Sequence, residues 1–381
     1  MHKKTLIALL LLAFALPAKA QFFLAGDDPA RLRWYSVETP HYELIYPEGA
    51  DSLARSYGRA LEQFRVPMGR SLGGMTPGDG MRRKMPVVLH TNHIYSNGSV
   101  GWAPSRMDLY THPEFYGSEP TSWTTMLASH EPRHQAQLQF GQRGVIPWFT
   151  GQMWAPVYWQ LYLEQALGEG DAVAAETGLA PGTRARTNEF LNFYRVSLDH
   201  GDYRNWDRWR YGSFKHFTPD HYALGYVTIA GARSLYNDPQ IVREALDLSW
   251  KKPWYFAPYN TRKIISQHAG KPFKEAFRDI LDHFNETWQA SADARGPFMP
   301  AEPLTPDASY GLCFSSPQWG NDGVLYALRE SYLRPMELVA INPTTRKAKR
   351  LSSFASHTSY LVYEPVKHRL YWSETIPDPR C

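Results

Sequence analysis

Residues 129–134 have the sequence Ser-His-Glu-Pro-Arg-His, and this stretch decides how the rest of the chain is interpreted. It contains the pattern H-E-x-x-H, in which His130 and His134 are four residues apart. On an α-helix, residues with this spacing lie on one face, so two imidazoles can bind one metal ion. Histidine nitrogens bind zinc at about 2.0–2.1 Å, and Glu131 lies beside them as a base for a zinc-activated water. A catalytic zinc site also needs a third protein ligand and one open position.

Pro132 occupies the middle of this motif. The predicted helix starts near Thr121, so Pro132 lies about three turns inside it. Proline has no N–H for the carbonyl one turn earlier, and its ring crowds the carbonyl of Ala128, which costs about 3 kcal/mol and bends a helix. Two outcomes are open: a kinked helix keeps both histidines on the metal side, or a break at Glu131 swings His130 away. We favour the kinked helix and expect a metal site of weak or restricted activity.

The first twenty residues are typical of a secretory signal peptide. Lys3 and Lys4 form a basic start, and the apolar core from Thr5 to Leu16 is too short to span a bilayer comfortably. Ala18-Lys19-Ala20 has the small-x-small pattern of a cleavage site, which predicts cleavage before Gln21. Later apolar runs are shorter than a membrane span. We therefore expect a periplasmic or secreted protein with no transmembrane segment in the mature chain.

Composition narrows the class of protein. Hydrophobic residues make up 43% and charged residues 20%, which is ordinary for a globular protein. The formal net charge is +4, but three of the 41 basic residues fall in the predicted signal peptide, so the mature chain is close to balance with its 37 acidic residues. Such a chain argues against nucleic acid as the main partner. The two cysteines, Cys313 and Cys381, exclude a cysteine-ligated metal site and a disulfide scaffold.

Sequence periodicity predicts a small mixed β-sheet in the first hundred mature residues, covered by one helix from Asp51 to Phe64. The predicted strands are 41–46, 85–89, 100–103 and 107–110. From Thr121 to about Gln289 the pattern is mostly helical, interrupted by a long aromatic and basic loop between Asp199 and Asp220. Candidate helices start near Thr121, Thr150, Gly170, Thr187, Asp220, Asp238, Thr261 and Lys271.

The character of the chain changes after a proline-rich stretch. Four prolines within residues 297–306 predict a linker. The short strands predicted after it, 324–328, 336–341, 348–351, 360–363 and 369–373, are typical of one β-propeller blade and part of another. The sequence thus predicts an α+β fold: a signal peptide at 1–20, a domain at 21–296 that begins with the small mixed sheet and continues as mostly helical, the linker at 297–306, and an incomplete propeller at 307–381.

Three motifs together resemble one group of enzymes. They are the zinc motif His130 to Gln135, the stretch Glu169-Gly170-Asp171-Ala172, and Tyr222-Ala223-Leu224-Gly225. Over roughly residues 31–285 the chain resembles the gluzincin metallopeptidases, which include thermolysin-like and aminopeptidase-like enzymes. Within that clan it is similar to the peptidase-MA-like domains that precede a TolB-like propeller. These relatives usually carry Trp three residues before the ligand Glu, where this chain has Ala166.

The resemblance implies roles for individual residues. In those proteins a second helix opens with E-G-x-A, and its Glu is the third zinc ligand, which implies Glu169 here, with Glu164 as the alternative in another register. The Tyr of a Y-x-x-G motif stabilises the oxyanion of the tetrahedral intermediate, which implies Tyr222, with His221 as the alternative. An edge strand beside the cleft binds extended peptides. The resemblance places that substrate-binding role on Gly101, Trp102 and Ala103.

The expected function is a secreted or periplasmic zinc-dependent peptidase that hydrolyses a peptide or protein substrate with metal-activated water. In this assignment His130, His134 and Glu169 hold Zn²⁺, Glu131 is the general base and Tyr222 is the oxyanion donor. One alternative is a catalytically inactive, peptidase-like module that binds peptide or glycan. Another is an envelope scaffold built around the propeller.

Three further carboxylate or imidazole groups have less defined expectations. Glu176 lies two helical turns after Glu169 on the same face, where a solvated carboxylate is expected more often than a partner of a metal ligand. His90 and His93 lie at a strand end without a nearby acidic partner, and we expect them to be polar loop residues.

Overall fold

The structure is a computed structural model. It describes residues 28–74, 84–93, 96–113, 119–142, 146–213, 216–251, 259–305, 312–331, 333–354 and 358–374. The predicted signal peptide at 1–20, Pro306 and Cys381 lie outside these residues. The chain divides into two compact units, one made of Met1–Asp202 with His221–Asn285 and one made of Tyr203–Asp220 with Glu286–Cys381. The described residues of the predicted linker, 297–305, form neither helix nor strand.

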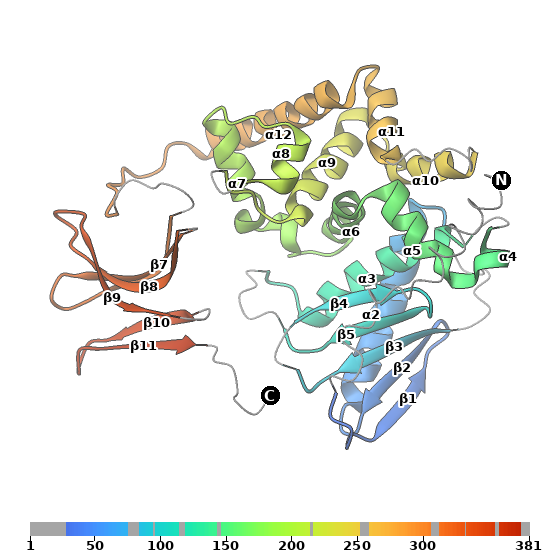
Figure 1. Ribbon diagram of the computed structural model, residues 1–381, viewed down its shortest axis with the longest axis horizontal. Helices are drawn as coiled ribbons and strands as arrows, with labels where there is room; N and C mark the ends of the chain where they lie inside the picture. The colour runs from blue at the N-terminus through green and yellow to red at the C-terminus, as the bar shows by residue number, and fades with distance from the viewer. Residues whose placement is uncertain are drawn as a thin grey trace, which may run out of the picture. The chain divides into compact units, whose positions relative to one another are not determined.

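The first unit contains a five-stranded mixed sheet with strand order β1-β2-β3-β5-β4. The central pairs β2–β3 and β3–β5 are parallel, and the outer pairs are antiparallel. This arrangement makes β4 an edge strand, as Figure 1 shows. The strands are β1 (Trp34–Glu38), β2 (Tyr42–Pro47), β3 (Met85–His90), β4 (Gly98–Gly101) and β5 (Arg106–Tyr110).

The mixed sheet and the α+β class agree with the sequence prediction. Strand β1 was missed, because all but one of its side chains are exposed and the strand lacks a buried face. In β2 and β3, buried side chains such as Leu44, Val87 and Leu89 alternate with half-buried ones, which is the period of a strand with one face in the core.

Two long helices, α2 (Asp51–Arg70) and α3 (Trp123–Phe140), lie side by side against the sheet. Tyr57 and Leu61 of α2 and Leu127 of α3 join the core of the sheet. Each large apolar side chain buried there contributes about 1.5–3 kcal/mol. Helix α2 extends beyond its predicted end at Phe64, since its last turns keep burying side chains such as Met68.

Helix α3 runs unbroken through Pro132. Its N-terminus is capped by Ser122, whose Oγ accepts a hydrogen bond from the backbone N–H of Thr125 at 3.2 Å. Every residue from Met126 to Leu138 is buried, so packing on all sides supports the helix where proline removes a hydrogen bond. A break at Glu131, the second outcome considered from sequence, does not occur.

The other helices of the first unit follow the predicted order, and most begin close to the predicted positions. They are α4 (Ile146–Thr150), α5 (Trp154–Tyr158), α6 (Gln165–Leu179), α7 (Asn188–Asp199), α9 (His221–Tyr236), α10 (Ile241–Lys251), α11 (Asn260–Ala269) and α12 (Phe273–Arg295), the last of which continues into the second unit. A π-helical turn at Trp159–Leu163 connects α5 to Glu164.

Helices α6 and α9 cross at a glycine pair. A Cβ on Gly170 would lie 1.9 Å from the carbonyl carbon of Gly225, a separation that atoms cannot adopt. Glycine at both positions therefore lets the two backbones touch. The resemblance implied that Glu169 and Gly170 open this helix. In the structure α6 begins at Gln165, so both residues lie inside the helix. The earlier start buries Ala166 and Leu167, which adds a further apolar turn to the helix.

The second unit combines a short helix with the C-terminal strands. Helix α8 (Trp206–Tyr211) occupies part of the stretch that was predicted to be a loop, and Asn205 caps it by accepting from Arg208 N at 2.9 Å. Four antiparallel strands follow in the order β6-β7-β8-β9, with a separate hairpin β10–β11. They are β6 (Cys313–Trp319), β7 (Leu325–Ser331), β8 (Arg334–Ile341), β9 (Ala348–Ser353), β10 (Thr358–Glu364) and β11 (Arg369–Glu374).

The hairpin is tied to the four-stranded sheet. Tyr363 N donates to Gln318 Oε1 at 3.3 Å, and Asn321 Nδ2 donates to the Pro365 carbonyl at 2.9 Å. Strands β7 to β11 overlap the five predicted strands, whereas β6 was not predicted. The assignment of these strands to a propeller stays a prediction.

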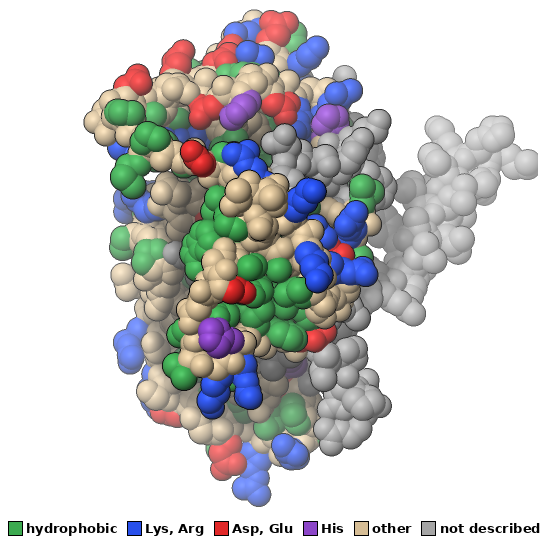
Figure 2. All heavy atoms as spheres, turned by 90° about the vertical axis from the view of Figure 1, so that its left-hand side faces the viewer, with side chains coloured by type: hydrophobic (Ala, Val, Ile, Leu, Met, Phe, Trp, Pro, Cys, Tyr) green, Lys and Arg blue, Asp and Glu red, His purple; other side chains and the backbone are tan. Residues whose placement is uncertain are grey.

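Large apolar side chains are exposed on these strands, including Val362, Tyr371 and Trp372, and Leu333 is exposed between β7 and β8. Figure 2 views the side where the strands lie and shows hydrophobic side chains among basic ones on this face. In the described part of the chain, no helix has both the length and the apolar character needed to cross a membrane.

Candidate metal centre

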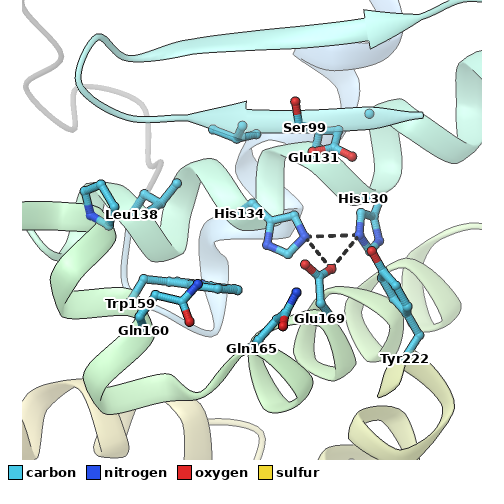
Figure 3. Close-up of a pocket in the computed structure, with 13 residues that line it drawn as sticks. Ser99, His130, Glu131, His134, Leu138, Trp159, Gln160, Gln165, Glu169 and Tyr222 are labelled. Carbon is cyan, nitrogen blue, oxygen red and sulfur yellow. Dashed lines mark hydrogen bonds and ion pairs between the residues drawn. The ribbon is translucent and has the colours of Figure 1, made fainter. Parts of the chain in front are cut away.

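Side chains from α3 and α6 converge at one point. His130 Nε2 and His134 Nε2 are 3.1 Å apart, and Glu169 Oε2 lies 3.4 Å from the first and 2.9 Å from the second. Figure 3 shows the two imidazoles and the carboxylate facing one another. Three ligand atoms on one tetrahedral zinc, each about 2.05 Å from the ion, would be about 3.3 Å apart. The observed separations are close to this value.

The hydrogen bonds of the two imidazoles determine which nitrogen is free. His130 Nδ1 lies 2.6 Å from Glu176 Oε2, and His134 Nδ1 lies 3.0 Å from Gln137 Oε1. Both oxygens only accept, so in the neutral imidazoles each Nδ1 carries the hydrogen and each Nε2 presents a lone pair. Three acceptor atoms then face one another, and a cation bound between them satisfies all three.

Glu176 and Arg184 support His130. Arg184 donates to both oxygens of Glu176, from Nε at 2.9 Å and from Nη2 at 2.9 Å. Arg184 Nη2 also lies 2.7 Å from His130 Nδ1, a contact between two donors that their shared acceptor Glu176 offsets. Burial alone would raise the pKa of Glu176, but Arg184 and His130 hold it below its usual value. An ionised carboxylate thus orients His130 and increases its basicity as a ligand.

Gln137 supports His134 in the same way. Its amide nitrogen donates to the Gly168 carbonyl at 3.0 Å and to Asp171 Oδ2 at 2.8 Å, which fixes the direction of the amide. The amide oxygen is then left to accept from His134 and from Trp159 Nε1, the latter at 2.8 Å. Both candidate histidine ligands therefore have a hydrogen-bonded partner of the kind found behind metal ligands.

The charges at the centre balance through protons when a cation is absent. Burial would raise the pKa of Glu169, but His134 and His130 hold it well below its usual value. Burial would lower the pKa of His134, but the Glu169 carboxylate raises it to about 9. The centre therefore favours a buried positive charge, which protons or a divalent ion can supply.

Glu131 points away from the ligand cluster towards strand β4 (Figure 3). Burial raises the pKa of Glu131 above its usual value. Its Oε2 is buried and forms no hydrogen bond with the residues that the structure describes. Gly98 of β4 makes room for this carboxylate, because a Cβ there would lie 2.5 Å from Glu131 Oε1. A desolvated carboxylate of raised pKa is suited to accept a proton near neutral pH.

The candidate ligands and Glu131 line a cavity of about 400 Å³. The lining also includes the side chains of Leu138, Pro156 and Trp159, which are largely apolar. Tyr222 of α9 also lines the cavity, with its ring centre 6.2 Å from that of His130. The Arg184 guanidinium carbon lies 5.0 Å from the centre of the Tyr222 ring, which orients the ring beside the cluster.

The residues predicted to bind substrate are placed differently from the rest. Gly98, Ser99 and Val100 line the cavity, whereas Gly101, Trp102 and Ala103 are not among the lining residues. Trp102 is buried in the core of the sheet. The edge strand β4 does border the cavity, so the peptide-binding role fits its first three residues more directly than the three that were predicted.

The alternatives for the third ligand and the oxyanion donor are also placed. Glu164 forms an ion pair with Arg262 at 2.7 Å and does not line the cavity, which leaves Glu169 as the carboxylate at the cluster. His221 packs against the ring of Tyr222, at 4.6 Å between centres, and only Tyr222 of the two lines the cavity.

Sequence reasoning missed the supporting groups and gave Glu176 the wrong environment. Glu176 is fully buried and bonded to His130 and Arg184, not solvated, because α6 lays its second half against α3. The seven-residue spacing from Glu169 was the signal for this role. His90 also differs from expectation: it has two acidic partners, Asp28 and Asp108, at 2.6 Å and 3.1 Å.

Comparison with known proteins gives no identification. The chain matches no protein-family model, and no curated protein matches it significantly. The functional argument therefore rests on the sequence motifs and on the geometry of the site.

Proposed function

We propose that this protein is a zinc-dependent peptidase of the gluzincin type, acting in the periplasm or outside the cell. The observation that carries the proposal is the convergence of His130 Nε2, His134 Nε2 and Glu169 Oε2 within 3.4 Å of one another. The spacing and the donor set of two imidazoles and one carboxylate fit a catalytic zinc site. The extracytoplasmic location is supported by the signal-like sequence of residues 1–20.

Zinc in such a site supplies Lewis-acid activation of water and of the substrate carbonyl. The residues of the chain supply the proton transfers and the binding contacts. Glu131 accepts a proton from the attacking water at its carboxylate and passes it to the leaving amine. Tyr222 donates a hydrogen bond from its hydroxyl to the oxyanion that forms at the carbonyl. The exposed edge of β4 binds the substrate backbone in extended form.

Pro132 supports a second candidate function. A proline inside the zinc motif removes a helical hydrogen bond next to the proposed base, and this favours a metal-binding module with little or no turnover. Such a module would bind peptide or glycan in the same cavity.

One comparison of three full-length proteins tests the proposal. We expect the parent to bind zinc and hydrolyse a quenched fluorescent peptide library. Glu131→Gln should keep its zinc and lose about 10²–10⁴-fold in kcat. Glu169→Gln should lose the zinc of this centre together with turnover.

Zinc binding without turnover in the parent, together with retained peptide binding, would establish the inactive module. Equal turnover in Glu131→Gln and the parent, at equal zinc content, would refute Glu131 as the base. A parent without zinc would refute the metal centre itself.

A further inference from the structure

A second cluster of metal-binding side chains lies at the end of strand β3. His90 is the last residue of β3 and His93 follows it, while Asp28 comes from the start of the described chain. One ligand atom from each of the three residues can be chosen such that all three atoms lie within 4.8 Å of one another. The cluster shares no residue with the candidate metal centre described above.

Asp28 connects the two imidazoles. Its Oδ2 lies 2.6 Å from His90 Nδ1, and its Oδ1 lies 3.3 Å from His93 Nε2. Oδ1 is buried, yet it forms no hydrogen bond with the residues that the structure describes. The short distance without a hydrogen bond leaves a buried carboxylate oxygen facing an imidazole nitrogen, an arrangement that a shared cation would satisfy.

The second nitrogen of His90 is held from behind. His90 Nε2 lies 3.1 Å from Asp108 Oδ1, and the other oxygen of Asp108 accepts from Arg106 Nε at 2.8 Å. Asp108 Oδ1 accepts the Nε2 hydrogen, so the neutral imidazole of His90 presents the lone pair of Nδ1 towards Asp28. A carboxylate behind a histidine ligand is the usual outer arrangement of zinc sites.

Tyr110 fixes the orientation of both imidazoles. His90 stacks on the Tyr110 ring with 4.5 Å between centres, and His93 meets the same ring edge-on at 5.0 Å. The side chains of His90 and His93 are each only 8% exposed. Two buried, preoriented imidazoles next to one carboxylate form a built site, not a chance pairing at the surface.

We propose that Asp28, His90 and His93 bind a second zinc ion. Two imidazoles and one carboxylate suit zinc better than calcium or magnesium, which prefer oxygen ligands alone. Because Asp28 lies more than 60 residues from His90 in the sequence, an ion held by both would fasten the start of the described chain to the sheet. The role assigned to this ion is structural, and the site is independent of the proposed peptidase activity.

Zinc stoichiometry of full-length variants tests this site. Each protein is equilibrated with zinc and dialysed, and its metal content is measured by mass spectrometry. We expect two zinc ions per chain in the parent and one fewer in His93→Ala. His41→Ala is the matched control, since His41 pairs with Glu62 at 2.7 Å outside both candidate sites and its loss should leave the zinc number unchanged. Equal zinc numbers in His93→Ala and the parent would overturn the proposal.

A second measurement keeps the test valid if His93→Ala folds poorly. In the His134→Ala background, which disables the first centre, zinc should raise the Tm of the chain, because an ion that binds only the folded state stabilises it. Adding the near-isosteric change Asp28→Asn should abolish that rise. An equal rise in both proteins would overturn the second site.

The two proposals fail separately. Zinc lost with His93→Ala but unaffected by His134→Ala supports the second site and refutes the first. Zinc lost with His134→Ala but unaffected by His93→Ala supports the first centre and refutes the second site.

Discussion

Arg133 and Asp171 join the two helices that carry the candidate metal ligands. Arg133 Nε donates to Asp171 Oδ2 at 2.7 Å, and Nη2 donates to Oδ1 at 2.8 Å. Arg133 immediately precedes the ligand His134 in α3, and Asp171 follows Glu169 by two residues in α6. The side chains are 1% and 0% exposed. A bidentate, buried pair at this position sets the spacing of α3 and α6 and with it the spacing of the ligands.

We expect Asp171→Ala to lower the free energy of unfolding by about 3–5 kcal/mol, because it leaves Arg133 buried without its carboxylate. Asp171 also pairs with Arg233 of α9, so the variant leaves two arginine side chains without this carboxylate partner. Urea unfolding of the full chain measures the loss. Asp282→Ala is the control, since Asp282 pairs with Arg278 on the surface and should change stability by less than about 1 kcal/mol. Similar losses in both variants would show that Asp171 has no special structural role.

The same pair predicts how stability depends on pH. Burial would raise the pKa of Asp171, but Arg133 and Arg233 hold it far below its usual value. The folded-state pKa is thus below the unfolded value of about 3.9. The stabilisation from Asp171 is then complete above about pH 4 and is lost as pH falls towards the folded-state pKa.

We therefore expect the stability gap between the parent and Asp171→Ala to be constant from about pH 7 to pH 5 and to narrow below about pH 4. Urea unfolding of the metal-free proteins at several pH values measures this gap. A gap that is the same at pH 5 and pH 3 would contradict a depressed pKa at Asp171.

Glu176→Gln should weaken zinc binding by about 10–100-fold, because His130 loses the charged partner that orients it. Competition with a chelator of known affinity measures the change. The matched control is Glu62→Gln: Glu62 Oε2 lies 2.7 Å from His41 Nδ1, in a pair of the same chemistry away from the candidate ligands. We expect no change in zinc affinity there. Equal affinities in the parent and Glu176→Gln would remove Glu176 from the metal centre.

Local spacing explains which parts of the site were predictable. His130 and His134 follow from the four-residue period of a helix, which the sequence displays directly. Glu169 required a resemblance, since its place opposite the histidines depends on how α6 crosses α3. The position of α6 also depends on its contact with α9 at Gly170 and Gly225, and no sequence pattern indicates that these two glycines pair.

Contacts between distant segments explain what was missed. Arg184 lies beyond the end of α6 and donates a hydrogen bond to Glu176, and His90 contacts Asp28, which is 62 residues away in the sequence. Neither pairing has a periodic signal, because each depends on tertiary packing and not on one helix or strand. Strand β1 was missed for a different reason: it pairs with its neighbour in sequence, β2, but all but one of its side chains are exposed, so the strand lacks a buried face.

Gly98 provides the last prediction. It begins strand β4, and a Cβ there would lie 2.5 Å from Glu131 Oε1 and 2.8 Å from Leu127 Cδ2. Both partners are buried, so Gly98→Ala must displace the carboxylate of the proposed base. The candidate metal ligands are not among the atoms nearest to a Cβ on Gly98, so we expect the zinc content to stay unchanged. A shift of about 1 Å in a catalytic group can cost about 10²-fold in rate, and kcat for peptide hydrolysis should fall on that scale.

Gly101→Ala is the matched control for this prediction, because it lies in the same strand and a Cβ there meets only backbone oxygens at 3.8 Å and 3.9 Å. These are ordinary contacts, so kcat should stay near that of the parent. If only Gly98→Ala lowers kcat, the effect comes from the contact with Glu131. If both variants lower kcat, strand β4 is sensitive to any added side chain. If both variants keep the kcat of the parent, the carboxylate of Glu131 can move without effect on turnover, and its position next to Gly98 has no part in catalysis.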